Sequence, residues 1–120
     1  MTNTKERTLL HNPSCSKSRL ALQMLEESGL DFTVREYLED PLSRGELETL
    51  QGLLGMEPLA WTRTGEPEWA DTGLNSSPSQ GEVLDAIAAR PKLMQRPILI
   101  SGGCARVGRP PEHLRELLEG

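Results

Sequence analysis

The most constraining feature of the sequence is a pair of short β-type runs separated by a single amphipathic helix. Residues 7–11 form the first run, which stops at the turn signal Asn12–Pro13. Apolar residues three and four positions apart then predict a helix over 16–28, and Gly29 is suited to end it. Apolar and polar residues alternate over 31–37, which predicts a second strand. Two strands joined in this way form a parallel pair through a right-handed crossover.

The rest of the chain predicts a helical middle followed by a hairpin. Ser43 and Glu46 have the spacing of a capping box, ahead of a helix that closes near Gly55. Beyond it, the pattern predicts a short helix at 57–62, a loop or broken helix over 63–77, a helix over 80–89, a hairpin of strands at 98–100 and 104–107 with its turn at 101–103, and a last helix starting at Pro110 and Pro111.

This order of elements predicts an α/β fold, in the form of a thioredoxin-like mixed sheet with a helical insertion. The 120 residues are expected to form a single domain. Within it, we expect residues 1–40 and 94–120 to build the thioredoxin-like core and residues 41–93 to build the insertion.

Composition and charge exclude several classes of protein. No apolar run reaches the roughly 18 residues of a membrane span, and the N-terminus lacks the pattern of a signal peptide, so we expect a cytoplasmic protein with no membrane partner. The net charge of −5 argues against a nucleic-acid partner. Two cysteines, Cys15 and Cys104, are too few for a disulfide scaffold, and their spacing to histidines predicts no metal site.

Positive charge is concentrated in one segment. Residues 86–111 contain no Asp or Glu but hold five basic residues, Arg90, Lys92, Arg96, Arg106 and Arg109. A basic segment in an acidic protein suggests a local site for an anion. The alternative is that these are ordinary solvated loop arginines, and the segment taken alone slightly favours that interpretation.

Cys15 is the strongest candidate for a reactive group. It follows a strand and a proline turn and stands at a helix start, where unpaired N–H groups and the helix dipole stabilise a thiolate. His11, Lys17 and Arg19 could add positive charge. The alternative is an inert buried cysteine, but the surrounding polar segment is unlike a core position, so we favour a reactive thiol. Ser18 replaces the second cysteine of a C-x-x-C motif, which excludes a disulfide within this loop.

The segment His11–Arg19 resembles the nucleophile loop of the glutathione/glutaredoxin-coupled arsenate reductase family, which has a thioredoxin-like fold with a helical insertion. The resemblance covers nearly the whole chain. It continues at Tyr37–Pro41, Ser43–Leu47, Arg63, Arg96–Ile98 and Arg109–Pro110.

The resemblance implies a role for each matching residue in the site. Cys15 matches the nucleophile, which attacks the oxyanion to form a cysteine-thiol arsenate adduct. Three arginines match the anion-binding residues of the family, and guanidinium forks suit tetrahedral oxyanions: Arg63, Arg96 and Arg109.

Other matches concern residues that support the nucleophile. His11 matches a residue that assists thiolate formation, and we place Arg19 with it as an assisting residue. Pro97 matches the proline that follows a cis peptide bond beside the nucleophile. The sequence departs from the best-characterised reductases in the pair Lys17–Ser18, where they commonly have a small residue together with Thr or Ser.

The resemblance therefore implies one arsenate-reductase-like domain over residues 1–120, an enzyme of arsenic detoxification. It would reduce arsenate to arsenite through Cys15, with glutathione as co-substrate, glutaredoxin as electron donor and no bound cofactor or metal. One alternative is a regulator of the Spx branch that binds RNA polymerase, although Ser18 argues against that branch, which typically carries C-x-x-C. Another is an arsenate-reductase-like protein with a different substrate.

A third alternative is an internal dithiol cycle, in which Cys104 resolves an oxidised Cys15. We expect Cys104 instead to be a buried core thiol, because free cysteines are often buried.

Overall fold

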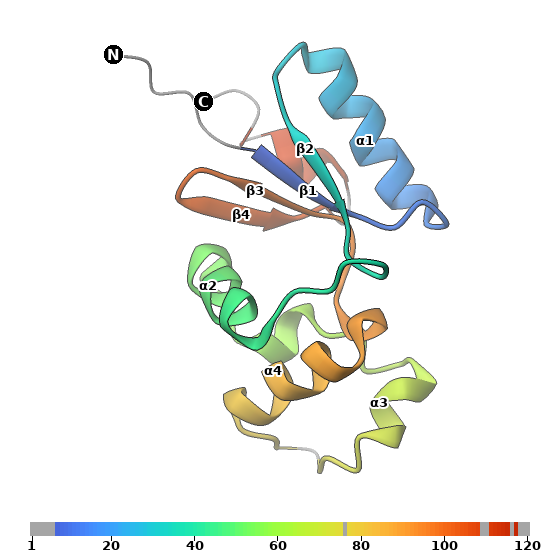
Figure 1. Ribbon diagram of the computed structural model, residues 1–120, viewed down its shortest axis with the longest axis vertical. Coiled ribbons are helices and arrows are strands. Elements are labelled where there is room, and N and C mark those ends of the chain that lie inside the picture. The colour runs from blue at the N-terminus through green and yellow to red at the C-terminus, as the bar shows by residue number, and fades with distance from the viewer. Residues whose placement is uncertain (1–6, 76, 109–110, 116, 118–120) are drawn as a thin grey trace. The chain divides into compact units, whose positions relative to one another are not determined.

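The computed structural model describes residues 7–75, 77–108, 111–115 and 117. Its sheet has four strands in the order β2-β1-β3-β4 (Figure 1). The strands are β1 (Arg7–His11), β2 (Thr33–Glu36), β3 (Ile98–Ser101) and β4 (Cys104–Val107). β1 pairs with β2 in parallel, and the β1–β3 and β3–β4 pairs are antiparallel. The predicted mixed sheet is confirmed, although the second strand is shorter than the segment 31–37.

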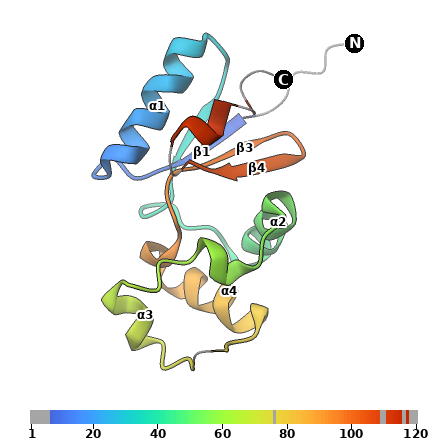
Figure 2. The same cartoon turned by 180° about the vertical axis from the view of Figure 1, so that it is seen from behind.

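Helix α1 (Ser16–Ser28) supplies the crossover between β1 and β2. It ends as predicted at Gly29, which has the left-handed φ of 74°. Its buried face packs with the sheet and with the 3-10 helix η3 (Pro111–Leu114), which lies beside α1 in Figure 2. The shared core consists of Leu9, Ala21, Leu25, Leu99, Leu114 and Leu117.

The end of the chain differs in detail from the prediction. The first turn of the last helix is a 3-10 turn, and Arg115 and Leu117 beyond it have helical backbone. Pro110 lies outside the described residues. Gly108 explains why this segment approaches the sheet so closely: a Cβ there would lie 2.9 Å from Leu114 Cδ1 and 3.0 Å from Pro97 Cγ.

The described residues divide into two compact units. The first, the sheet unit, consists of the described residues up to Tyr37 and from Arg96 onward. The second, the helical unit, consists of Leu38–Gln95. The second unit contains an isolated antiparallel bridge between Thr62 and Met94 and the helices α2 (Arg44–Leu54), η1 (Pro58–Trp61), α3 (Pro67–Asp71), α4 (Gln80–Ala89) and η2 (Pro91–Leu93).

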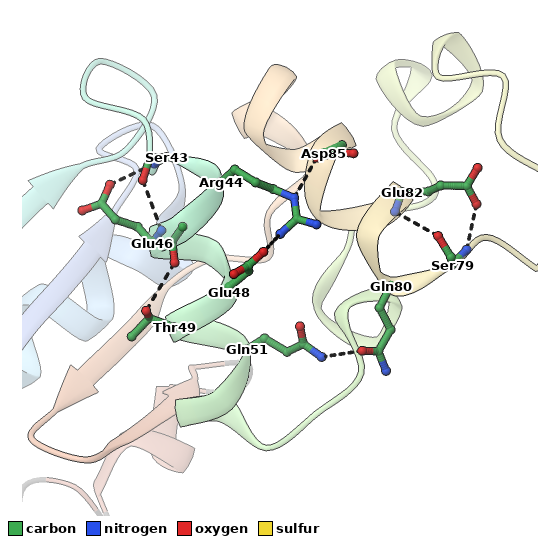
Figure 3. Close-up of polar contacts among 11 residues, drawn as sticks. Ser43, Arg44, Glu46, Glu48, Thr49, Gln51, Ser79, Gln80, Glu82 and Asp85 are labelled. Carbon is green, nitrogen blue, oxygen red and sulfur yellow. Dashed lines mark hydrogen bonds and ion pairs between the residues drawn. The ribbon is translucent and has the colours of Figure 1, made fainter.

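Local capping signals set the helix starts of the second unit (Figure 3). Ser43 and Glu46 form the predicted capping box of α2, and Ser79 with Glu82 forms a second one at α4. Arg44 then joins the two helices, because its guanidinium bonds both Glu48 on α2 and Asp85 on α4.

Candidate active site

Cys15 is the N-cap residue of α1, in extended conformation. Its N–H donates to the carbonyl of Asn12 at 3.0 Å, and its carbonyl accepts the N–H of Arg19 at 3.0 Å. The first bond closes a tight turn in the loop between β1 and α1, and the second is the first hydrogen bond of α1. The residue is 8% exposed, so the thiol lies in a nearly closed site rather than on an open surface.

The environment of Cys15 favours its thiolate. Burial raises the pKa of the thiol, but hydrogen bonds from the backbone N–H of Ser18 and from the Arg96 guanidinium outweigh burial. The charge of Arg96 and the N–H of Lys17 act in the same direction. The pKa of Cys15 is therefore lowered, in the direction that the helix-start position predicted.

Arg96 belongs to the second of the two sequence segments that form the sheet unit, whereas Cys15 belongs to the first. Arg96 stands two positions before β3, and the Arg96–Pro97 peptide bond is cis, as the resemblance implied. The carbonyl of Pro97 accepts the N–H of Gly108 at 2.8 Å. The fold thus places the Arg96 side chain against a nucleophile loop that lies about 80 residues away in the sequence.

His11 and Ser18 form a buried pair beneath the nucleophile loop. His11 is 5% exposed, and its Nδ1 lies 2.7 Å from the Ser18 hydroxyl, which also accepts the N–H of Asn12 at 2.9 Å. Ser18 is fully buried, so its hydroxyl ties the start of α1 to the end of β1. The sequence identified Ser18 as the residue that removes a second thiol but missed this structural contact.

One expectation about His11 is wrong. Its pKa lies below the ordinary value of 6.5, chiefly because of burial and also because of the positive charge of Arg19, with Glu36 opposing. His11 is therefore neutral near pH 7 and adds no positive charge to the site. The sequence could not show this, because the burial of the ring depends on packing around β1.

Arg19 and Lys17 act through local contacts. Arg19 Nη1 donates to the carbonyl of Pro13 at 2.8 Å, which braces the loop. Lys17 has an exposed side chain and reaches the Cys15 thiol only through its backbone N–H. The assisting role of Arg19 remains a prediction.

Arg63 belongs to the helical unit. Its N–H donates to the carbonyl of Leu93 at 2.6 Å, and its Nη2 lies 3.4 Å from Glu66 Oε2. Arg109 lies outside the described residues. The role of both arginines in anion binding stays a prediction, as does the place of Pro97 beside the nucleophile. The residues that the structure brings together are Cys15, Arg96, His11 and Ser18.

Two basic residues of the segment 86–111, which lacks Asp and Glu, have their own contacts in the structure. Lys92 Nζ lies 3.5 Å from Glu68 Oε2, and Arg90 Nη2 lies 3.5 Å from the carbonyl of Asp71. Both contacts lie within the helical unit. In the described part of this segment, Arg96 is the arginine whose charge acts on the Cys15 thiol.

Cys104 is exposed, and the expectation of a buried core thiol is wrong. It pairs with Ser101 at the hairpin end of β3 and β4, and the alternation of the strand buries Ala105 instead. Ser101 also pairs with Arg7, at the opposite end of β1 from the nucleophile loop. Four residues of strand separate these ends, about 13 Å at roughly 3.3 Å per residue.

Among the described residues no helix is long and apolar enough to cross a membrane. The same part of the chain contains no group of three or more His, Cys, Asp or Glu side chains placed to hold a metal ion.

A thioredoxin-like fold with a thiolate-stabilising cysteine at the start of its first helix defines a class of thiol-dependent proteins. Comparison with known proteins identifies the family within this class. Residues 10–117 match the model of the ArsC family, and the chain belongs to that family. It is 40% identical over 117 residues to YfgD of Escherichia coli, covering 96% of this chain and 98% of that protein.

Two further relatives carry an enzyme name. An arsenate reductase of Haemophilus influenzae is 38% identical over 112 residues, which cover 92% of this chain and 97% of that protein. The structure of an arsenate reductase from Vibrio cholerae superposes with a TM-score of 0.90 at 40% identity, covering 96% of this chain and 99% of that one. The predicted family and fold are thereby confirmed.

Proposed function

We propose that this chain is a thiol-dependent arsenate reductase that uses Cys15 as its nucleophile. The observation that carries the proposal is the convergence of two backbone N–H groups and the Arg96 guanidinium on the Cys15 thiol. Such donors stabilise the attacking thiolate, and Arg96 is suited to the negative charge of a tetrahedral oxyanion. The arsenate reductases among the relatives support arsenate as the oxyanion.

In the first step, the Cys15 thiolate attacks the arsenic atom of arsenate. A sulfur–arsenic bond forms and one arsenic–oxygen bond breaks, with the oxygen leaving as water after protonation. Arsenic is still pentavalent in this adduct. Arg96 holds the remaining oxygens and offsets their charge.

In the second step, we propose glutathione as the reductant. Its thiolate attacks the Cys15 sulfur, the sulfur–arsenic electron pair passes to arsenic, and trivalent arsenite leaves. Cys15 is then joined to glutathione in a mixed disulfide, which the thiol of glutaredoxin reduces by exchange. Two observations favour an external thiol: Ser18 stands where a nearby second cysteine would be, and Cys104 lies at the far end of the strands.

The test is a coupled assay with arsenate, glutathione, glutaredoxin and NADPH. Wild type should consume NADPH in proportion to arsenate, Cys15→Ser should not, and Cys104→Ser should match wild type. Trapped wild-type enzyme should carry one glutathione on Cys15. Replacing glutathione and glutaredoxin with thioredoxin and its reductase tests the donor: turnover with that pair alone would refute the glutathione step but not the arsenate reductase activity.

A further inference from the structure

Tyr37 lies beside the candidate active site, although the functional proposal gives it no role. In the parallel register of β1 and β2, His11 pairs with Glu36, so the next residues, Asn12 and Tyr37, leave the sheet at the same edge. Helix α1 and the nucleophile loop begin at this edge. Tyr37 is the only tyrosine of the sequence and is 1% exposed.

The hydroxyl of Tyr37 is buried and makes no hydrogen bond within the described residues. The side chain of Asn12 lies near it, short of hydrogen-bonding geometry. Buried hydroxyl groups are nearly always hydrogen-bonded, and leaving one without a partner destabilises a fold. An acceptor that the described residues do not supply is therefore expected to bind this hydroxyl.

Electrostatic effects show what surrounds the phenol. Burial raises the pKa of Tyr37 to about 12, the guanidinium of Arg96 opposes this rise, and the Cys15 thiolate adds to it. The hydroxyl thus lies within reach of both charges of the site. Because its pKa is so high, it keeps its proton at neutral pH and can only be a donor or a neutral acceptor there.

We propose that the Tyr37 hydroxyl donates a hydrogen bond to the tetrahedral oxyanion bound between Cys15 and Arg96, and that Tyr37 is therefore a substrate-binding residue. This inference rests on the proposed function for the identity of the substrate. Arg96 supplies charge to the anion, and Tyr37 supplies a neutral, directional donor. An oxyanion oxygen is an acceptor that suits an unpaired O–H group and lies next to a guanidinium.

The test compares wild type with Tyr37→Phe, which removes the hydroxyl and keeps the ring. Ser101→Ala is the matched control, because Ser101 also carries a buried hydroxyl without a hydrogen bond in the described residues but pairs with Arg7 and Cys104, away from the thiol. Affinities for inorganic phosphate and for arsenate without glutathione are measured by titration calorimetry. The single tyrosine, labelled with carbon-13 at the ring carbon bearing oxygen, gives one NMR signal that reports on phosphate addition.

We expect Tyr37→Phe to bind both anions about ten- to a hundredfold more weakly, the range for one hydrogen bond to a charged group. Ser101→Ala should bind them as wild type does. The labelled tyrosine signal should shift when phosphate saturates wild type. The anion-free melting temperature of Tyr37→Phe should equal or exceed that of wild type, because the substitution removes an unsatisfied group.

Equal anion affinity of wild type and Tyr37→Phe would overturn the proposal. In particular, a lower anion-free melting temperature with unchanged affinity would show that the hydroxyl serves the fold, through a trapped water. If wild type binds phosphate but does not reduce arsenate, the proposed function fails, while the phosphate affinities still decide the role of Tyr37. If wild type binds neither anion, both proposals fail.

Discussion

Removal of the Arg96 guanidinium should raise the pKa of Cys15. The substitution that isolates this effect is Arg96→Met, since methionine fills much of the space of arginine without its charge or its donors. The background is Cys104→Ser, so that Cys15 is the only thiol. Arg106→Met is the matched control. Arg106 belongs to the same segment 86–111 without Asp or Glu, but it lies on β4, where its Nη1 donates to the carbonyl of Ala105.

The size of the effect follows from the groups that bind the thiolate. Arg96 contributes both a hydrogen bond and a charge, whereas Ser18 and Lys17 contribute backbone N–H groups that the substitution leaves in place. A hydrogen bond to a charged group is worth about 1.5–3 kcal/mol, and 1.36 kcal/mol corresponds to one pKa unit. Burial of the thiol continues to oppose ionisation. The pKa of Cys15 should therefore rise, and the thiolate fraction well below that pKa should fall about ten- to a hundredfold.

The rate of alkylation by iodoacetamide measures the thiolate fraction. Recorded as a function of pH, it gives the pKa as its midpoint, and peptide mapping confirms the labelled residue. Well below the midpoint, Arg96→Met should react about ten- to a hundredfold more slowly than its parent, and Arg106→Met should match the parent. An unchanged midpoint in Arg96→Met, or an equal rise in Arg106→Met, would refute the assignment of Arg96 as the partner of the thiolate.

Three further predictions concern the fold and the second cysteine. Gly108→Ala should destabilise the protein by about 1–3 kcal/mol in denaturant unfolding, since its Cβ would overlap Leu114. Gly52→Ala, on the open face of α2, should instead stabilise it by about 0.5–1 kcal/mol, and similar losses in both variants would refute the packing argument. Because the pKa of His11 is lowered on folding, the unfolded chain binds more protons, so the free energy of unfolding should fall as pH drops below about 6.5; a His11→Gln variant with the same pH dependence would contradict this. Cys104→Ser should keep most reductase activity, whereas a trapped disulfide between Cys15 and that residue would contradict the external-thiol step.

Much of the fold could be predicted because its signals are local. Gly29 ends α1 because the left-handed conformation requires little more than a missing Cβ. Ser43 and Glu46 start α2 through contacts with each other, and the bounds of α4 follow from the same logic at Ser79. Each of these helix ends is set by residues only a few positions apart, so the sequence alone is enough to predict it.

The misassigned residues depend instead on packing between distant segments. The exposure of Cys104 is set by the register of β4 against β3, and a shift of one residue would have buried it in place of Ala105. The neutral state of His11 depends on how fully β1 is covered. The strand predicted over 31–37 had Tyr37 as its last residue, but only the register of β1 and β2 brings this residue to the nucleophile loop.

The way in which Cys15 is stabilised explains why the loop can depart from the family pattern at Lys17. The contribution of Lys17 to the thiolate comes from its backbone N–H, and its side chain is exposed. Any residue other than proline supplies the same backbone donor. Ser18 is different, because its hydroxyl is buried between His11 and the N–H of Asn12, where a larger or apolar side chain would leave that N–H without its acceptor. Position 17 is therefore free to change, whereas position 18 must keep a small hydroxyl-bearing residue to hold the thiol at the start of α1.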